Sequence, residues 1–506
     1  MISRKFVTFL VVAGIALTPT ARAASSLPRG VPEEQGIDST GILKLIDALE
    51  HDVKSAHSLM IVRHGKVVAE GWWSPYAAED THVLYSLTKS FTSTAVGFAV
   101  KEGKLSLDDR VISFFPDLAP ANPSANLRAM RVRDLLRMNS GHQNDTMDRL
   151  RAHADGAWVK AFLSLEVENK PGTRFVYNSG ASYVLSAIVQ KVTGQTLNDY
   201  LQPRLFTPLG IDQHPWAITS EGIALGEGGL ALRTEDIAKF GLMYLQRGLW
   251  NGEQLLPVSW VAMATSLQTS NGSDPNSNWE HGYGFQFWIN KTTGFRGDGA
   301  MGQLCFVLPE YDTVVAVTSG TSDMGGLMDT IWEALLPAIH VVPLTPNFDA
   351  QEKLRNRLSH LTLPTTPGEA HSAREKEISG KTYTFPANDE SVSAVRLDFS
   401  GEKPVITFQN EDGQHAITCG VGAWTRGRTG FQKSISRLFD RKEQGVGTSG
   451  AWTAPNIFTV QLCFDETPYI VTYRFTIEGD KLLMDTEHNV RWGPTTLPQL
   501  TGSRAP

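Results

Sequence analysis

The order in which strand-like and helix-like patterns follow one another most constrains the fold of this chain. Residues 58–72 contain two short apolar runs around a turn, which is typical of a hairpin. From about 134 to 260 the apolar spacing is mostly helical. Strand-like runs then return at 283–288, 303–308 and 313–318. Strands at both ends of a helical middle predict one antiparallel sheet in which the first and last strands meet.

The C-terminal part of the chain has a different pattern. Residues 346–377 are polar and rich in proline near their ends, so they are predicted to form a linker. From 378 to 506 the chain shows many short alternating runs and almost no helical period. This pattern predicts a C-terminal all-β domain, a small barrel or sandwich, that can be separated from the first domain.

The N-terminal residues have the composition of an export signal. Arg4 and Lys5 precede an apolar run at 6–17, which is followed by Ala21-Arg22-Ala23. This run is too short to span a bilayer, and no later segment has the pattern of a membrane span. We therefore predict a cleavable signal peptide at 1–23, a periplasmic or secreted protein, and a first domain at 24–345.

Charge and cysteine content exclude several classes of function. The formal net charge is −7, and removing the predicted signal takes away three cations, which leaves −10. Such a chain is a poor partner for nucleic acid. The three cysteines, Cys305, Cys419 and Cys463, form no CxxC motif, so no metal or other cofactor is predicted. Cys419 and Cys463 fit either a disulfide or two buried strand thiols.

One short motif suggests nucleophilic catalysis. Ser86 and Lys89 have S-x-x-K spacing at the expected start of a helix that runs from about 86 to 101. This spacing places both side chains on the same helix face, where an amine can take the proton of a hydroxyl. A second S-x-x-K match at Ser400 lies between two strand-like runs and is predicted to be a turn.

Longer stretches around this motif resemble a known family. Leu84–Phe91, followed by Lys104–Asp109, looks like the class C β-lactamase-related family within the penicillin-binding-protein and β-lactamase superfamily. Pro171–Gly180 resembles the stretch where that family carries its catalytic Y-x-N tyrosine motif. The resemblance covers about residues 30–335. It implies an α+β/α/β fold in which an antiparallel sheet is flanked by helices and carries a helical subdomain.

The resemblance also implies a set of catalytic residues. Ser86 corresponds to the nucleophile, Lys89 to the lysine beside it, and Tyr177 to the tyrosine that completes the proton-transfer network. The third position of the tyrosine motif is Ser179 instead of asparagine, and Asn178 stands one place early. The contacts that the family asparagine makes with the substrate are therefore expected to differ here.

The third motif of the family, K-T-G or H-x-G, is degenerate. Gly297-Asp298-Gly299-Ala300 fits its place best, because a strand follows at the family's distance. Gly299 would let a substrate approach the backbone, and the Ala300 N–H could be an oxyanion donor. The lysine or histidine that would bind a substrate carboxylate is missing, and Arg296 is the candidate replacement.

Taken together, these residues predict a serine hydrolase that cleaves a small-molecule ester, amide or peptide-like substrate through a Ser86 acyl-enzyme. The missing cation predicts that simple esters or small amides are cleaved faster than β-lactams. Two alternatives stay open: a penicillin-binding or β-lactamase-type protein, and a catalytically degenerate binding protein. The sequence does not fix the oligomeric state.

Overall fold

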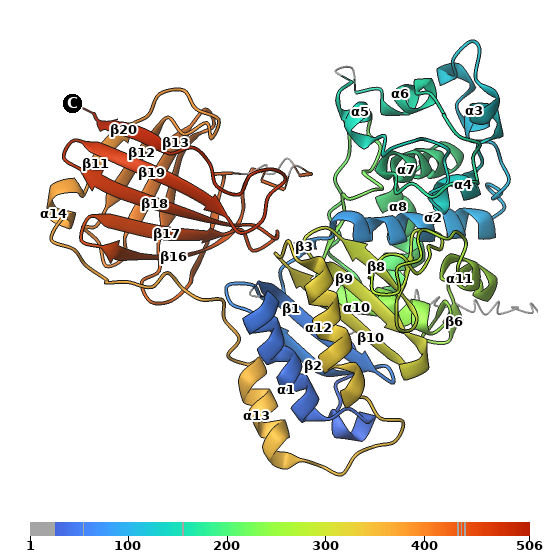
Figure 1. Ribbon diagram of the computed structural model, residues 1–506, viewed down its shortest axis with the longest axis horizontal. Helices are drawn as coiled ribbons and strands as arrows, with labels where there is room; N and C mark the ends of the chain where they lie inside the picture. The colour runs from blue at the N-terminus through green and yellow to red at the C-terminus, as the bar shows by residue number, and fades with distance from the viewer. Residues whose placement is uncertain are drawn as a thin grey trace, which may run out of the picture.

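The computed structural model describes residues 26–505, except for residues 54, 154–155, 433–434, 437 and 440–441. The predicted signal peptide at 1–23 lies outside the described residues. Within the described part of the chain, no helix combines the length and apolar character needed to cross a membrane. Figure 1 shows a body of sheet and helices, with a separate red and orange barrel formed by the C-terminal strands.

The first body is built on a six-stranded antiparallel sheet in the order β2-β1-β10-β9-β8-β7. Its strands are β1 (Ala56–Arg63), β2 (Lys66–Trp72), β7 (Trp288–Ile289), β8 (Phe295–Gly299), β9 (Gln303–Leu308) and β10 (Thr313–Ser319). β1 pairs with β10, and Ile61 lies opposite Val315. The prediction that the first and last strands meet is therefore confirmed.

Helices cover both faces of this sheet. Helices α1 (Ser39–Ala48) and α12 (Met324–Ala334) lie on one face, and α10 (Thr234–Leu245) packs against the strands on the other face. Every residue of β1 is buried. Its alternate side chains enter two separate cores, Leu59 on the side of α1 and Met60 on the side of α10. Burial on both faces explains the continuous apolar run at 59–62 within β1.

A helical subdomain is inserted between β2 and the later strands (Figure 1). Its longest members are α2 (Thr88–Lys101) and α7 (Ser179–Thr193), which pack against each other. The shorter helices are α3 (Ala125–Ala129), α4 (Val132–Leu136), α5 (Met147–Arg151), α6 (Trp158–Ser164), α8 (Leu197–Leu201), α9 (Thr207–Leu209) and α11 (Val258–Ala264). Two small ribbons pair β3 (His82–Val83) with β4 (Ala231–Leu232) and β5 (Leu249–Trp250) with β6 (Glu253–Gln254).

The C-terminal strands form a ten-stranded antiparallel sheet in the order β14-β13-β12-β11-β20-β19-β18-β17-β16-β15. They are β11 (Lys381–Thr384), β12 (Ala394–Asp398), β13 (Val405–Asn410), β14 (Gly413–Thr418), β15 (Thr425–Thr429), β16 (Gln444–Ala454), β17 (Ile457–Cys463), β18 (Ile470–Glu478), β19 (Lys481–His488) and β20 (Leu500–Arg504). The edge strands β14 and β15 contact each other, which nearly closes the barrel. The predicted fold class is confirmed in both parts.

The stretch predicted as a linker contains a helix. Helix α13 (Phe348–Leu358) packs against α1 and buries Ala350, Gln351 and Leu354, so it belongs to the first body. Most of its other residues are charged or polar, and this low apolar content is why the sequence was typical of a linker. A second short helix, α14 (Glu375–Ile378), precedes the barrel.

The barrel contacts the first body close to the start of α2. The Val83 N–H donates to the Glu466 carbonyl at 3.0 Å, and the Arg426 guanidinium binds the Asp80 carboxylate at 2.6 Å. Cys305, Cys419 and Cys463 are all buried free thiols. The contacts of Glu466 and Arg426 therefore join the barrel to the residues just before Ser86.

Candidate active site

Ser86 lies in a short 3₁₀ turn, η3 (Tyr85–Leu87), immediately before α2. The expected helix start is therefore two residues early, but the S-x-x-K spacing still brings the two side chains together. Lys89 Nζ donates a hydrogen bond to Ser86 Oγ at 2.9 Å and a second one to the Glu227 carbonyl oxygen at 2.8 Å. Lys89 is 1% exposed, whereas Ser86 is half-buried. The partly exposed Ser86 hydroxyl is therefore hydrogen-bonded to an amine that two hydrogen bonds hold in place.

The surroundings of Lys89 weaken its hold on a proton. Burial lowers its pKa from 10.5 to about 8, and the Arg151 guanidinium acts in the same direction. The carboxylates of Glu227 and Asp145 oppose this change. A substantial fraction of neutral amine is therefore present near pH 8, and a neutral amine can accept the proton of Ser86.

Tyr177 reaches the same point from the loop before α7. Its hydroxyl interacts with that of Ser86, and Lys89 Nζ lies 5.0 Å from the centre of its ring. Burial raises the pKa of the phenol well above its usual range, and the interaction with Ser86 offsets this only in part. The phenol therefore stays protonated at neutral pH and can donate a hydrogen bond.

The two residues after Tyr177 serve the helix that follows. Asn178 is fully buried as the N-cap of α7, where its side-chain oxygen accepts hydrogen bonds from Ala181 N and from Thr146 Oγ1. The Ser179 N–H donates to Asp145 Oδ1 at 2.9 Å. Asn178 thus orients the chain beside Tyr177 and does not face a substrate.

The end of β8 runs close to the turn that holds Ser86. A Cβ atom on Gly299 would lie 2.0 Å from the Leu84 carbonyl oxygen, so only glycine permits this approach. Ala300 follows directly and is half-buried against the barrel core. The third-motif stretch is therefore next to the nucleophile segment, as its place in the sequence suggested.

Arg296 does not offer its charge to a ligand. The side chain is 0% exposed. Its guanidinium binds Asp298 Oδ2 at 3.0 Å, the Asn278 carbonyl at 2.8 Å and Asn290 Oδ1 at 3.2 Å. All three partners lie in the first body, and together they occupy the hydrogen-bond donors of the guanidinium. The hypothesis that Arg296 replaces the missing cation is therefore not supported by its position.

Glu227 is a residue that the sequence reasoning missed. Its side chain is 4% exposed, and neither carboxylate oxygen has a hydrogen-bond partner among the described residues. The nearest counter-charge is the Arg151 guanidinium at 3.9 Å. Burial raises the pKa of Glu227, and the Glu227 carboxylate in turn acts to raise the pKa of Lys89. The available signal was a lone acid inside the glycine run at 226–229.

The barrel also reaches this site, which no local pattern could indicate. Tyr85, the residue before Ser86, has a φ of 46°, a left-handed conformation that costs free energy in a residue other than glycine. Its hydroxyl lies 2.7 Å from that of Tyr469 at the start of the barrel strand β18. Leu438, from the loop between β15 and β16, packs against the core of the first body.

Comparison with known proteins gives consistent results. A family model described as Beta-lactamase matches residues 45–338, more than half of the chain. A 6-aminohexanoate-dimer hydrolase from Paenarthrobacter ureafaciens is 26% identical over 330 residues, which are 61% of this chain and 83% of that protein. Penicillin-binding protein 4 from Amycolatopsis lactamdurans is 29% identical over 253 residues, covering 43% of this chain and 65% of the relative.

Among solved structures, one from Bacillus anthracis named "Putative 6-aminohexanoate-dimer hydrolase" superposes with a TM-score of 0.51. It is 19% identical, and the alignment covers 61% of this chain and 86% of that one. At this identity the likeness concerns the fold of the first body alone.

Proposed function

Because this chain belongs to the Beta-lactamase family of serine hydrolases, we propose that it cleaves an ester or amide bond through an acyl-enzyme on Ser86. The observation that carries the proposal is the 2.9 Å hydrogen bond from Lys89 Nζ to Ser86 Oγ, made by an amine whose pKa is lowered to about 8. A serine hydroxyl becomes a useful nucleophile only when a nearby base removes its proton.

In the proposed first step, Ser86 Oγ forms a bond to the substrate carbonyl carbon while its proton moves to the neutral amine of Lys89. The C–O or C–N bond to the leaving group then breaks, and the leaving group takes a proton from the ammonium through the Tyr177 hydroxyl. In the second step, water attacks the acyl carbon and gives a proton to the neutral amine of Lys89; the bond between Ser86 Oγ and the acyl carbon then breaks, Ser86 Oγ takes that proton, and the acid product leaves. Tyr177 acts here as a protonated relay, in keeping with its raised pKa.

In both steps a negative charge develops on the carbonyl oxygen of the substrate, and hydrogen-bond donors must stabilise it. We assign the backbone N–H groups of Ser86 and Ala300 to this role, because the close approach of Gly299 to Leu84 sets the end of β8 beside the nucleophile turn. Preorganised backbone donors of this kind stabilise a tetrahedral intermediate more than the ground state.

The electrostatics of the site favour substrates without a carboxylate. The carboxylates of Glu227, Asp145 and Asp298 surround Lys89 and stabilise its ammonium form, which raises its pKa. The charge of Arg296 is neutralised by its ion pair with Asp298. A charged hydrogen bond to a substrate carboxylate is worth roughly 1.5–3 kcal/mol, which is one to two decades in rate when it is made in the transition state. Simple esters and small amides are therefore expected to react faster than penicillins or cephalosporins.

A substrate panel tests this function. The purified full chain would be given short-chain nitrophenyl esters, D-amino-acid amides and a chromogenic cephalosporin, alongside Ser86→Ala and Tyr177→Phe. We expect hydrolysis of an ester or amide that Ser86→Ala abolishes and that Tyr177→Phe slows by at least about a hundredfold. Hydrolysis that survives in Ser86→Ala would exclude the proposed acyl-enzyme.

A further inference from the structure

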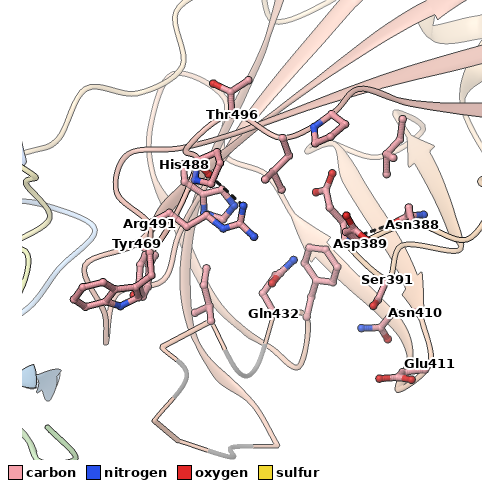
Figure 2. A pocket seen from close by; sticks show the side chains of 18 of the residues that line it. Asn388, Asp389, Ser391, Asn410, Glu411, Gln432, Tyr469, His488, Arg491 and Thr496 are labelled. Carbon is pink, nitrogen blue, oxygen red and sulfur yellow. Dashed lines mark hydrogen bonds between the residues drawn. The ribbon is translucent and has the colours of Figure 1, made fainter. Parts of the chain in front are cut away.

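The barrel contains a cavity separate from Ser86. Its volume is about 1080 Å³, and its lining residues lie in and beside loops at the barrel end that faces the first body in Figure 1. The loops β11–β12, β13–β14, β15–β16, β17–β18 and β19–β20 all contribute residues to it, and Figure 2 shows their side chains around the hollow. A barrel of about this size can enclose one small ligand where side chains do not fill its mouth.

The charges around the cavity are unequal. The carboxylates of Asp389, Glu390 and Glu411 line it, and Arg491 is the one lining side chain among the described residues with a fixed positive charge. In Figure 2, Asp389 and Glu411 lie on one side, and Arg491 lies with His488 on the other. The side of the cavity formed by Asp389, Glu390 and Glu411 is therefore negatively charged and attracts cations.

Two polar side chains of the cavity, the buried His488 and the half-buried Glu390, have atoms without hydrogen-bond partners. His488 is 8% exposed, and its Nδ1 atom has no hydrogen-bond partner among the described residues. The same holds for both carboxylate oxygens of Glu390. Burial raises the pKa of Glu390, and the Thr486 hydroxyl and the Arg491 charge oppose that rise. A buried group left without a partner is costly, so both side chains gain from a bound polar ligand.

Part of the lining is apolar, beside polar residues such as Asn410, Gln432 and Thr496. Phe431 and Leu497 contribute to the wall, and Trp492, which also lines the cavity, is 51% exposed and forms a T-shaped ring contact with Tyr85. Apolar side chains beside carboxylates form a site for a ligand that carries both an apolar chain and a positive charge. The aromatic ring of Trp492 also favours a cation.

We propose that the barrel cavity binds an organic ammonium, a protonated amine carrying an apolar chain, with the ammonium at the Glu390 carboxylate. The hydrocarbon chain lies against Phe431 and Leu497. This site is distinct from the proposed hydrolase site and does not depend on it. It gives the C-terminal domain a binding function of its own.

Calorimetric titration of the full chain with n-octylammonium, at a concentration below micelle formation and at pH 7, tests the proposal. n-Octanoate, which has the same chain length and the opposite charge, is the matched ligand. We expect one octylammonium per chain and at least tenfold weaker binding of octanoate. Octanoate that binds as tightly as octylammonium would overturn the proposal.

Variants locate the site. Glu390→Gln should weaken octylammonium binding by about tenfold or more, and the exposed Glu402→Gln, in the loop at the opposite barrel end, should leave it unchanged. Asp389→Asn, at an exposed position, should weaken it about threefold and covers the case in which Glu390→Gln does not fold. Unchanged affinity in folded Glu390→Gln or in Asp389→Asn contradicts the assignment.

The Ser86→Ala chain separates the two proposals. It should bind octylammonium as the native chain does, whether or not the native chain hydrolyses esters. Binding that is lost in Ser86→Ala would place the amine at the hydrolase site instead of in the barrel.

Discussion

The hydroxyl oxygens of Tyr85 and Tyr469 lie 2.7 Å apart, although 384 residues separate them in the sequence. Tyr85 holds a left-handed backbone immediately before Ser86, and Tyr469 lines the barrel cavity. A residue in such a conformation persists only where surrounding contacts fix it. The barrel therefore supports the backbone that presents the proposed nucleophile.

Tyr469→Phe should consequently slow ester hydrolysis by about three- to tenfold, because it removes the 2.7 Å hydrogen bond between the Tyr85 and Tyr469 hydroxyls. The free energy of unfolding should fall by about 1 kcal/mol, the usual value of one such bond. Tyr383→Phe is the control, since that buried barrel hydroxyl has no hydrogen-bond partner among the described residues. Equal hydrolysis rates in the two variants would argue against support of Ser86 by the barrel.

The pH dependence of hydrolysis should follow Lys89. The reactive form carries a neutral amine, and the lowered pKa is about 8, so kcat/KM on a neutral ester should rise with pH and level off above about 8. Lys89→Arg should lose at least about a hundredfold at every pH, because a guanidinium does not release its proton. A flat profile between pH 6 and 9 in the native chain would rule out Lys89 as the base.

Glu227→Gln should move that profile to lower pH. The Glu227 carboxylate stabilises the ammonium form of Lys89 and so raises its pKa, and the neutral amide removes this effect. The measurement is the midpoint of kcat/KM against pH, with the exposed and distant Glu310→Gln as control. A midpoint that stays in place or moves to higher pH would contradict the role given to Glu227.

Arg296→Ala should destabilise the fold instead of altering substrate choice. It leaves the Asp298 carboxylate buried without its main partner, a loss of roughly 3–5 kcal/mol for a buried pair. Denaturant unfolding measures the change. A variant of native stability that selectively loses cephalosporin hydrolysis would instead restore Arg296 as a ligand for substrate carboxylates.

Much of the fold could be predicted from local patterns. The two-sided apolar run of β1, the alternating strands of the barrel and the S-x-x-K spacing at residues 86–89 all carry their signal within a few residues. Helix α13 was missed because a helix that buries only three side chains on one face has the composition of a linker.

The missed parts of the site have a different cause. Glu227 acts through its position beside Lys89, and Tyr469 through a contact across two domains. Arg296 carries a charge that the sequence shows, but its burial against Asp298 does not appear in any spacing. Such relationships depend on tertiary packing, which a single sequence does not report.

The most direct test of the central claim is mass mapping of the native full chain after reaction with a fluorophosphonate. One label on Ser86 is expected, because that hydroxyl has a lysine amine of lowered pKa at 2.9 Å and is half-buried. The exposed Ser400, in the other S-x-x-K match, should stay unlabelled. Label that maps mainly to Ser179 or Ser400, with Ser86 unmodified, would contradict the assignment of the nucleophile.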